Sequence, residues 1–193
     1  MKILTRWLLA CCLLVSFAAG AAAPKDQNPE PRKTYNQEEV LKAAEDFFGT
    51  GAKGLANVIE KAFKEQGEPV AIIRGEEAGA AIGLGLRYGH GQLMYKGAGD
   101  GMSVYWQGPS LGFDFGANGA KAFVLVYNLP SADALFQRFP GVEGSLYFVG
   151  GFGLNYVQKE KIILAPVRFG LGWRQGASVG YMHFSRKKRY NPF

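Results

Sequence analysis

The spacing of apolar residues along this chain changes at Gly67. Before Gly67, apolar residues recur every three or four positions, which is the period of an amphipathic α-helix. Asn36 and Glu39 have the spacing of a capping box, and Gly49 and Gly67 are typical helix ends. We therefore expect one helix from Asn36 to Gly49 and a second over 52–66. Their apolar stripes contain Val40, Leu41, Ala44, Phe47 and Phe48 in the first helix, and Leu55, Val58, Ile59, Ala62 and Phe63 in the second.

After Gly67 the period becomes two, which indicates half-buried β-strands. Turn signals occur at 89–91 (Gly-His-Gly), 96–101, 108–109 (Gly-Pro) and 118–119 (Asn-Gly). A short helix is predicted over 131–138, with a serine as its N-terminal cap. The expected strands are 69–75, 80–88, 91–96, 102–108, 110–116, 121–128, 144–158 (with a bend at 150–151), 161–173 and 177–185.

Nine or ten short strands at this regular spacing predict a fold that is mainly β with accessory α: a small antiparallel β-barrel with two N-terminal helices and one short helix. Glycine alternates with large apolar residues within 82–86, 112–116 and 169–173. Glycine in a strand permits tight coiling or the close approach of another group. We expect the two long helices to pack on the barrel or to plug one end.

The first 23 residues have the layout of a secretory signal peptide. Lys2 and Arg6 precede an uncharged apolar run, small residues follow it, and Pro24 opens a polar segment. The apolar run is short for a membrane span, although an uncleaved anchor and a lipoprotein signal at Cys11 are alternatives. Export to the periplasm leaves a mature chain of about 170 residues, which fits one domain. Both cysteines leave with the leader, which excludes disulfides and thiol chemistry from the mature chain.

Positive charge accumulates toward the end of the chain. The net charge is +6, and from Lys161 onward there are seven basic residues and no acidic ones. A basic patch favours anionic partners such as lipid headgroups or lipopolysaccharide, and export argues against nucleic acid. A simple solvated tail is the alternative. The residues expected to meet an anionic surface are Arg186, Lys187, Lys188 and Arg189.

These patterns divide the chain into five parts: a signal peptide (1–23), a flexible linker with three prolines (24–35), a helical pair packed on the barrel (36–67), the β-barrel (68–186) and a basic tail (187–193).

The sequence offers little catalytic chemistry. Ser110 lies in a Gly-x-Ser-x-Gly string, but a hydrolase elbow needs a strand before the serine and a helix after it, and here strand signals follow. His90 and His183 are the only histidines, and neither lies in a metal-ligand motif. Asp114 lies between two phenylalanines in a strand and either points outward or pairs inward with a base such as Arg87. We expect no enzyme activity, no cofactor and no metal.

Aromatic residues are abundant, and most are expected in the core. A barrel of this size can hold one small ligand, so some aromatic side chains are candidates to line an apolar cavity. The candidate ligand-binding residues are Trp106, Phe113, Asp114, Phe152, Tyr156 and Trp173.

Several segments resemble known families. The stretches 80–97 and 110–128 with the following short helix are similar to SYLF-type lipid-binding domains, and residues 35–185 resemble the alphaproteobacterial envelope integrity family EipA. The EipA resemblance implies a small periplasmic β-barrel with accessory helices that maintains the cell envelope without known enzyme activity. The SYLF resemblance implies lipid or membrane contact, although acidic Glu38 and Glu39 in the first helical turn argue against direct insertion of that helix.

We therefore expect a non-enzymatic periplasmic protein that supports envelope integrity. Its partner would be a lipid, lipopolysaccharide, peptidoglycan or an envelope protein, and peripheral membrane contact is one option. The alternative is a small outer-membrane β-barrel, which needs strands of about 9 to 11 residues with an apolar outer face. A serine hydrolase using Ser110 ranks third.

Overall fold

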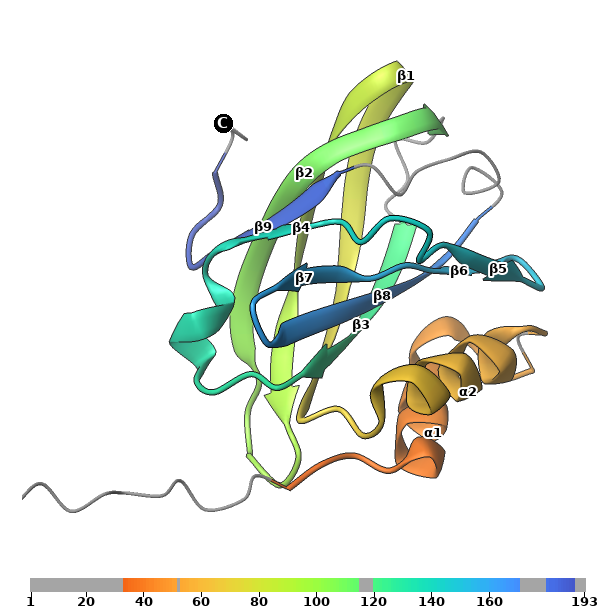
Figure 1. Cartoon of the computed structure of the whole chain (residues 1–193), viewed down its shortest axis with the longest axis vertical. Coiled ribbons are helices and arrows are strands. Elements are labelled where there is room, and N and C mark those ends of the chain that lie inside the picture. The colour runs from red at the N-terminus through yellow and green to blue at the C-terminus, as the bar shows by residue number, and fades with distance from the viewer. Residues whose placement is uncertain (1–32, 52, 115–119, 171–179, 190–193) are drawn as a thin grey trace, which may run out of the picture. The chain divides into compact units, whose positions relative to one another are not determined.

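The computed structural model describes residues 33–51, 53–114, 120–170 and 180–189, and the backbone alone at 80–84 and 110–114. Two helices precede a nine-stranded sheet (Figure 1). The helices are α1 (Gln37–Phe48) and α2 (Leu55–Gln66). The strands are β1 (Ala71–Tyr95), β2 (Met102–Asp114), β3 (Ala120–Tyr127), β4 (Arg138–Pro140), β5 (Tyr147–Val149), β6 (Phe152–Leu154), β7 (Val157–Lys159), β8 (Ile162–Phe169) and β9 (Tyr181–Ser185).

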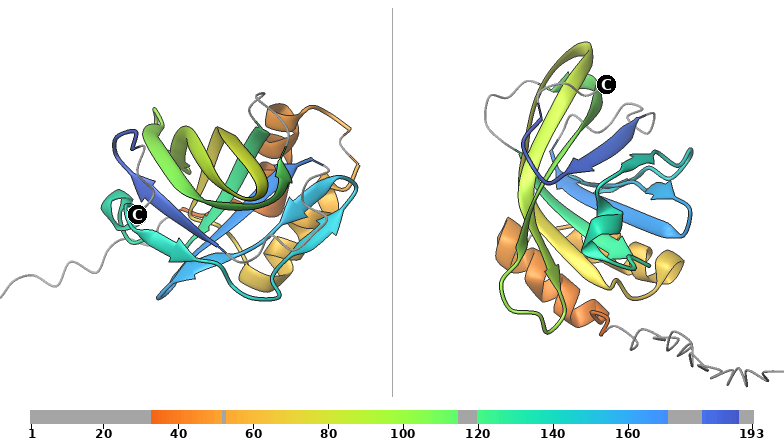
Figure 2. Two further views of the ribbon diagram at one scale, coloured as in Figure 1. Left: turned by 90° about the horizontal axis from the view of Figure 1, so that it is seen from above. Right: turned by 90° about the vertical axis from the view of Figure 1, so that its left-hand side faces the viewer.

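The sheet is antiparallel and strongly curled, as the view from above shows (Figure 2). The strand order is β4-β9-β2-β1-β3-β8-β6-β5, and β7 also pairs with β8. A backbone bridge joins Gly141, just after β4, to Val157 in β7. The Val142 amide also donates to the Tyr156 carbonyl at 2.9 Å. The first strand of this path, β4, therefore meets β7 at the edge of β8, and the predicted barrel-like, mainly β fold is confirmed.

The strand β1 is one extended segment that turns back on itself (Figure 1). Gly75 lies against Gly91, and Gly79 lies against Leu86, so the chain reverses between residues 79 and 86. The first half of β1 pairs with β3 and the second half pairs with β2. The turn predicted at 89–91 is wrong, because these residues are extended within the returning half of β1. Glycine is needed there because a Cβ on Gly91 would lie 2.3 Å from the Arg74 carbonyl oxygen.

The structure also differs from the predicted turn at 108–109 and from the predicted helix at 131–138. Residues 108–109 do not end a strand, since β2 continues through them to Asp114. The helix predicted over 131–138 is a single 3₁₀ turn (Ala132–Leu135), and its last residue, Arg138, instead begins β4, which pairs with β9. Ser131 caps this turn as expected, accepting from the Ala134 amide at 3.3 Å. The turn predicted at 118–119 lies outside the described residues.

Both long helices form where the apolar spacing predicts them. The Asn36–Glu39 capping box is present, with both reciprocal hydrogen bonds at 2.9 Å. The second helix begins at Leu55, a little later than predicted, because Gly54 precedes it with a left-handed φ of 93°. A Cβ on Gly54 would lie 2.4 Å from the Val149 carbonyl oxygen, so a glycine is required where the helical loop meets the β5–β6 turn.

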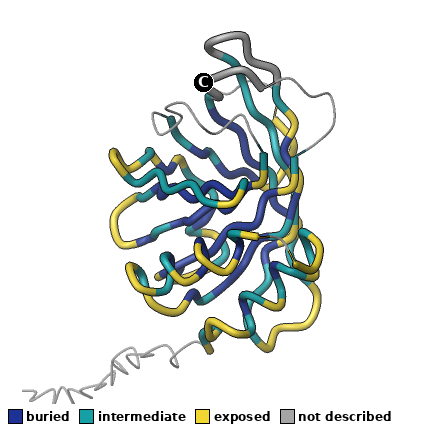
Figure 3. Tube along the Cα trace, turned by 90° about the vertical axis from the view of Figure 1, so that its right-hand side faces the viewer, coloured by how far each residue is buried: buried dark blue, intermediate teal, exposed yellow. Residues whose placement is uncertain are grey.

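The sheet is buried on both faces where the helices cover it (Figure 3). Along β3, Val124 and Val126 face the inside of the barrel, while Phe123, Leu125 and Tyr127 face α1 and α2. The protein therefore has two apolar cores, one within the curled sheet and one between the sheet and the helices. The helices pack on the barrel wall, as the first of the two expected arrangements requires.

Candidate functional site

A buried ion pair lies inside the barrel. The period-two pattern of β1 and β8 places Glu77 and Arg168 on the inner face, and they are 4% and 2% exposed. Arg168 donates from Nε to Glu77 Oε2 at 2.6 Å and from Nη2 to Oε1 at 2.7 Å. The remaining hydrogen-bonding capacity is also used, since Arg168 Nη1 donates to Asn155 Oδ1 at 3.1 Å and Trp106 Nε1 donates to Glu77 Oε1 at 2.7 Å. A second cation, Arg87, places its Nε 3.5 Å from Glu77 Oε2.

These contacts hold Glu77 in its charged form. Burial by itself would raise the pKa of this carboxyl, but the positive charges of Arg168 and Arg87 and the hydrogen bonds from Arg168 and Trp106 lower it to about 2. A buried pair of this kind is costly to desolvate and even more costly to break. The pair therefore fixes β1 against β8 and does not act as a proton donor or acceptor near neutral pH.

The indole of Trp106 lies against bare backbone. A Cβ on Gly89 would lie 2.1 Å from Trp106 Cε2, and one on Gly75 would lie 2.6 Å from Trp106 Cη2. Gly89, Trp106 and Phe184 form a cross-strand row on the inner face, with the two aromatic ring centroids 5.7 Å apart. The strand glycines thus provide the space in which a large side chain reaches Glu77.

The opposite, outer face of the same strands carries a second set of residues. Strand register places His90, Tyr105 and Ser185 in one row across β1, β2 and β9. The neighbouring row extends to β4 and contains Tyr88, Gln107, His183 and Arg138. Aromatic rings, polar groups and cations therefore share one side of the sheet.

A cavity of about 460 Å³ opens on this side, and we name it the C-terminal cleft. Most of its wall is the outer face of β1 and β2, and the segment after β9 closes it with two exposed cations. Its lining consists of Glu76, Glu77, Ala78, Tyr88, Gly89, His90, Tyr105, Trp106, Gln107, Ser185, Lys188 and Arg189.

The segment after β9 is held in place by its first residues. Arg186 pairs with Asp133 and lies over the Phe136 ring, 4.5 Å from its centroid. Ser185 Oγ donates to the Lys187 carbonyl at 2.8 Å. These contacts direct Lys188 and Arg189 toward the cleft.

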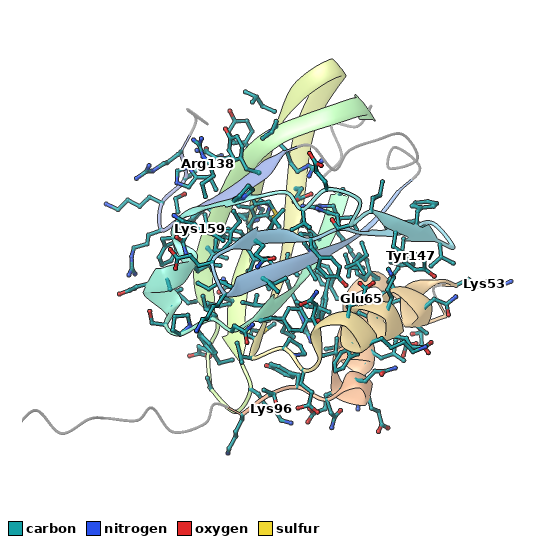
Figure 4. All side chains as sticks on the ribbon, in the orientation of Figure 1. Lys53, Glu65, Lys96, Arg138, Tyr147 and Lys159 are labelled. Carbon is teal, nitrogen blue, oxygen red and sulfur yellow. The ribbon has the colours of Figure 1, made fainter. Side chains whose placement is uncertain are left out.

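Positive charge is dense around this segment. Burial, Arg138 and Arg189 together lower the pKa of His183 below its usual value. Arg138 lies over the ring of Tyr181, 4.2 Å from its centroid, at the end of the molecule remote from Lys53 (Figure 4). The lowered pKa means that a third positive charge is unfavourable here, while an incoming anion would be attracted.

The structure distributes the predicted site residues over several places. It brings Trp106, Lys188 and Arg189 to the C-terminal cleft, while Arg186 is paired and Lys187 is exposed beside it. Phe152 and Tyr156 lie in the core beneath the helices, where Tyr156 donates to Glu65 Oε2 at 2.6 Å. The backbone of Phe113 and Asp114 belongs to β2, but their side chains, like all of Trp173, lie outside the described residues.

The sequence analysis did not predict the buried ion pair of Glu77 and Arg168. Arg87 is one of the two options given above for Asp114, whose side chain lies outside the described residues, and the structure places Arg87 beside Glu77. Alternation could have identified Glu77, because it lies two and four positions after Gly75 and Ile73 on the inner face. Arg168 alternates in the same way with inward-facing Leu164. Two oppositely charged residues at inward-facing strand positions are therefore the sequence signal for this ion pair.

The backbone around Ser110 differs from that of a hydrolase elbow. Ser110 lies within the continuous strand β2, paired with Gly85, so its backbone is not the strand-to-helix turn of a hydrolase elbow. No group of three metal-ligating side chains occurs among the residues that the structure describes. Within the same residues, none of the helices has the length and apolar character needed to cross a membrane.

Comparison with known proteins agrees with this fold. A crystal structure of a β-barrel-like, uncharacterised protein from Brucella abortus superposes with a TM-score of 0.76 and 45% sequence identity, covering 83% of this chain and 99% of that one. No curated protein matches the chain. The family model of Envelope integrity protein A matches residues 33–193. The chain therefore belongs to the Envelope integrity protein A (EipA) family.

Proposed function

We propose that this EipA-family protein is a non-enzymatic periplasmic protein that supports the cell envelope by binding an anionic envelope component at the C-terminal cleft. Membership in the EipA family supports an envelope-related function. The observation that carries the finer proposal is the cleft itself, in which Lys188 and Arg189 stand beside a wall of polar and aromatic side chains. Cations next to a concave surface attract and retain anions.

The outer face of the barrel favours this proposal over the alternative of an outer-membrane barrel. A lipid-facing barrel needs an apolar band around its outside. Here the outer apolar side chains of β3, such as Phe123 and Leu125, are buried under α1 and α2. Elsewhere the outer face carries polar groups, as in the 3.0 Å hydrogen bond from Gln92 Nε2 to Ser103 Oγ.

Complementation of a deletion strain tests the proposal. We expect cells lacking the protein to become sensitive to detergent and to cell-wall antibiotics, and the wild-type chain to restore resistance. The double variant Lys188→Gln, Arg189→Gln should fail to restore it. Lys42→Gln, Lys53→Gln is the matched control, since it removes the same charge from exposed positions on the helical side. Full complementation by both variants at equal protein levels would refute the proposal.

A further inference from the structure

The C-terminal cleft combines three kinds of chemistry whose arrangement restricts its ligand. Two cations, Lys188 and Arg189, lie on the segment after β9, two tyrosines lie on the sheet wall, and a carboxylate, Glu76, lies on the first half of β1. Gln107 and Ser185 add polar groups and are only 3% and 7% exposed. The cleft is therefore neither purely basic nor purely apolar.

Each simpler ligand leaves part of this wall unexplained. A bare phosphate or sulfate would use the cations, but Glu76 would repel it and the tyrosine rings would contribute nothing. A fatty acyl chain would pack on Tyr88 and Tyr105, but it would cover the Glu76 carboxylate with a group that has no hydrogen-bond donor. The ligand must carry an anionic group, a face that packs on aromatic rings, and hydroxyl donors.

A phosphorylated sugar has all three properties. Its phosphate accepts charge-assisted hydrogen bonds from lysine and arginine. The C–H face of a sugar ring is weakly positive and packs on the negative face of an aromatic ring. Its hydroxyl groups can donate to Glu76 and exchange hydrogen bonds with Gln107 and Ser185. The volume of about 460 Å³ lies within the range of small-molecule sites.

Resting on the proposed function, we infer that the C-terminal cleft binds a phosphorylated sugar, with Lys188 and Arg189 on the phosphate and Tyr105 against the ring. The strand register supports placing the sugar ring against Tyr105. Tyr105 lies between His90 and Ser185 in its row, so its ring is flanked by groups that can hydrogen-bond to sugar hydroxyls.

Isothermal titration calorimetry of the purified full-length protein tests the inference. The probes are glucose 1-phosphate, glucose and inorganic phosphate at one pH and ionic strength. We expect glucose 1-phosphate to bind about tenfold or more tightly than either other probe. Tyr105→Ala should remove this advantage and leave phosphate binding unchanged, whereas Tyr105→Phe, which keeps the ring, should retain it. Lys188→Gln, Arg189→Gln should weaken glucose 1-phosphate and phosphate together.

Equal binding of phosphate and glucose 1-phosphate, no binding of glucose 1-phosphate, or a Tyr105→Ala variant that retains the sugar advantage, would overturn the inference. Circular dichroism of each variant confirms that its fold is intact. The outcome is separable from that of the proposed function. If Lys188→Gln, Arg189→Gln fails to complement a deletion strain while Tyr105→Ala complements fully, the proposed function stands and the sugar assignment falls.

Discussion

Glu77 and Arg168, 91 residues apart in the chain, form a two-point ion pair inside the barrel with both hydrogen bonds under 2.8 Å. The pair joins the first strand to β8 through the barrel interior, and Trp106 adds a hydrogen bond from β2. The same tryptophan contributes to the wall of the C-terminal cleft. The shape of the cleft therefore depends on a buried electrostatic contact.

Removing the carboxylate should destabilise the fold. Glu77→Gln leaves Arg168 buried without a counter-ion, which typically costs roughly 3 to 5 kcal/mol of unfolding free energy. Urea denaturation followed by tryptophan fluorescence measures the change. Glu76→Gln is the matched control, because the neighbouring carboxylate is exposed, and it should change stability by less than about 0.5 kcal/mol. Equal stability of the two variants would contradict the role given to the pair.

The pair also predicts acid sensitivity. The pKa of Glu77 is about 2 in the folded protein, below the ordinary value of 4.5. A carboxyl whose pKa is lowered by folding stabilises the protein above the ordinary value, and this contribution is lost as pH falls toward the folded value. Unfolding free energy should therefore decrease between about pH 4.5 and pH 2. In the Glu77→Gln variant the contribution of Glu77 to this decrease should be absent. If the variant and the wild type show the same pH dependence of unfolding free energy, Glu77 does not make this contribution.

Glycine at position 89 should be indispensable. A Cβ there would overlap the Trp106 indole, and overpacking of this kind typically costs roughly 1 to 3 kcal/mol. Gly89→Ala should lower the thermal midpoint and shift tryptophan emission. Gly99→Ala in the β1–β2 turn is the control, because nothing lies within 4 Å of its Cβ position. If both variants melt together, the close contact between Gly89 and Trp106 is not present in solution.

The helices should be tied to the barrel by Tyr156. Its hydroxyl donates to Glu65 of α2 at 2.6 Å, and Glu65 also pairs with Lys61. A hydrogen bond to a charged acceptor typically contributes roughly 1.5 to 3 kcal/mol to stability. Because solvent screens the part-exposed Glu65 carboxylate, we expect about 1 kcal/mol from this bond. Tyr156→Phe should therefore lose about 1 kcal/mol in chemical denaturation. Tyr147→Phe is a suitable control, since the described residues offer its hydroxyl no hydrogen bond; an equal loss in both variants would argue against the tie.

His183 should report anion binding. Burial, Arg138 and Arg189 lower its pKa, so an anion beside these cations should raise that pKa toward the ordinary value of 6.5. NMR titration of the imidazole in sulfate and in chloride, at equal ionic strength, measures the shift. His183→Asn identifies the signal by its loss. A pKa that is the same in both salts would mean that no divalent anion binds near these cations.

Local patterns predicted much of the fold because they reflect local physics. The capping box at Asn36 and the apolar stripes specify both helices, and alternation specifies most of the strands. The turn at 89–91 was misplaced because glycine serves two purposes, and here it allows close packing instead of a reversal. Gly89 packs against Trp106 of the neighbouring strand β2, and the residues around Gly89 in the sequence do not indicate this contact.

The site was only partly predictable for the same reason. The basic end of the chain and Trp106 were recognised separately as candidates. Their convergence depends on the pairing of β2 with β9, which no short-range pattern encodes. Phe152 and Tyr156 were equally plausible by composition, but the helices cover that face of the sheet.

Binding to isolated cell envelopes tests the central claim most directly. The purified full-length protein is sedimented with envelopes at about 0.05 M and about 0.5 M NaCl, because higher salt screens exposed charges. We predict that the wild-type chain and the Lys42→Gln, Lys53→Gln control bind at low salt and are released at high salt, and that Lys188→Gln, Arg189→Gln stays in the supernatant throughout. Equal sedimentation of both double variants would contradict a role for the C-terminal cleft in envelope binding.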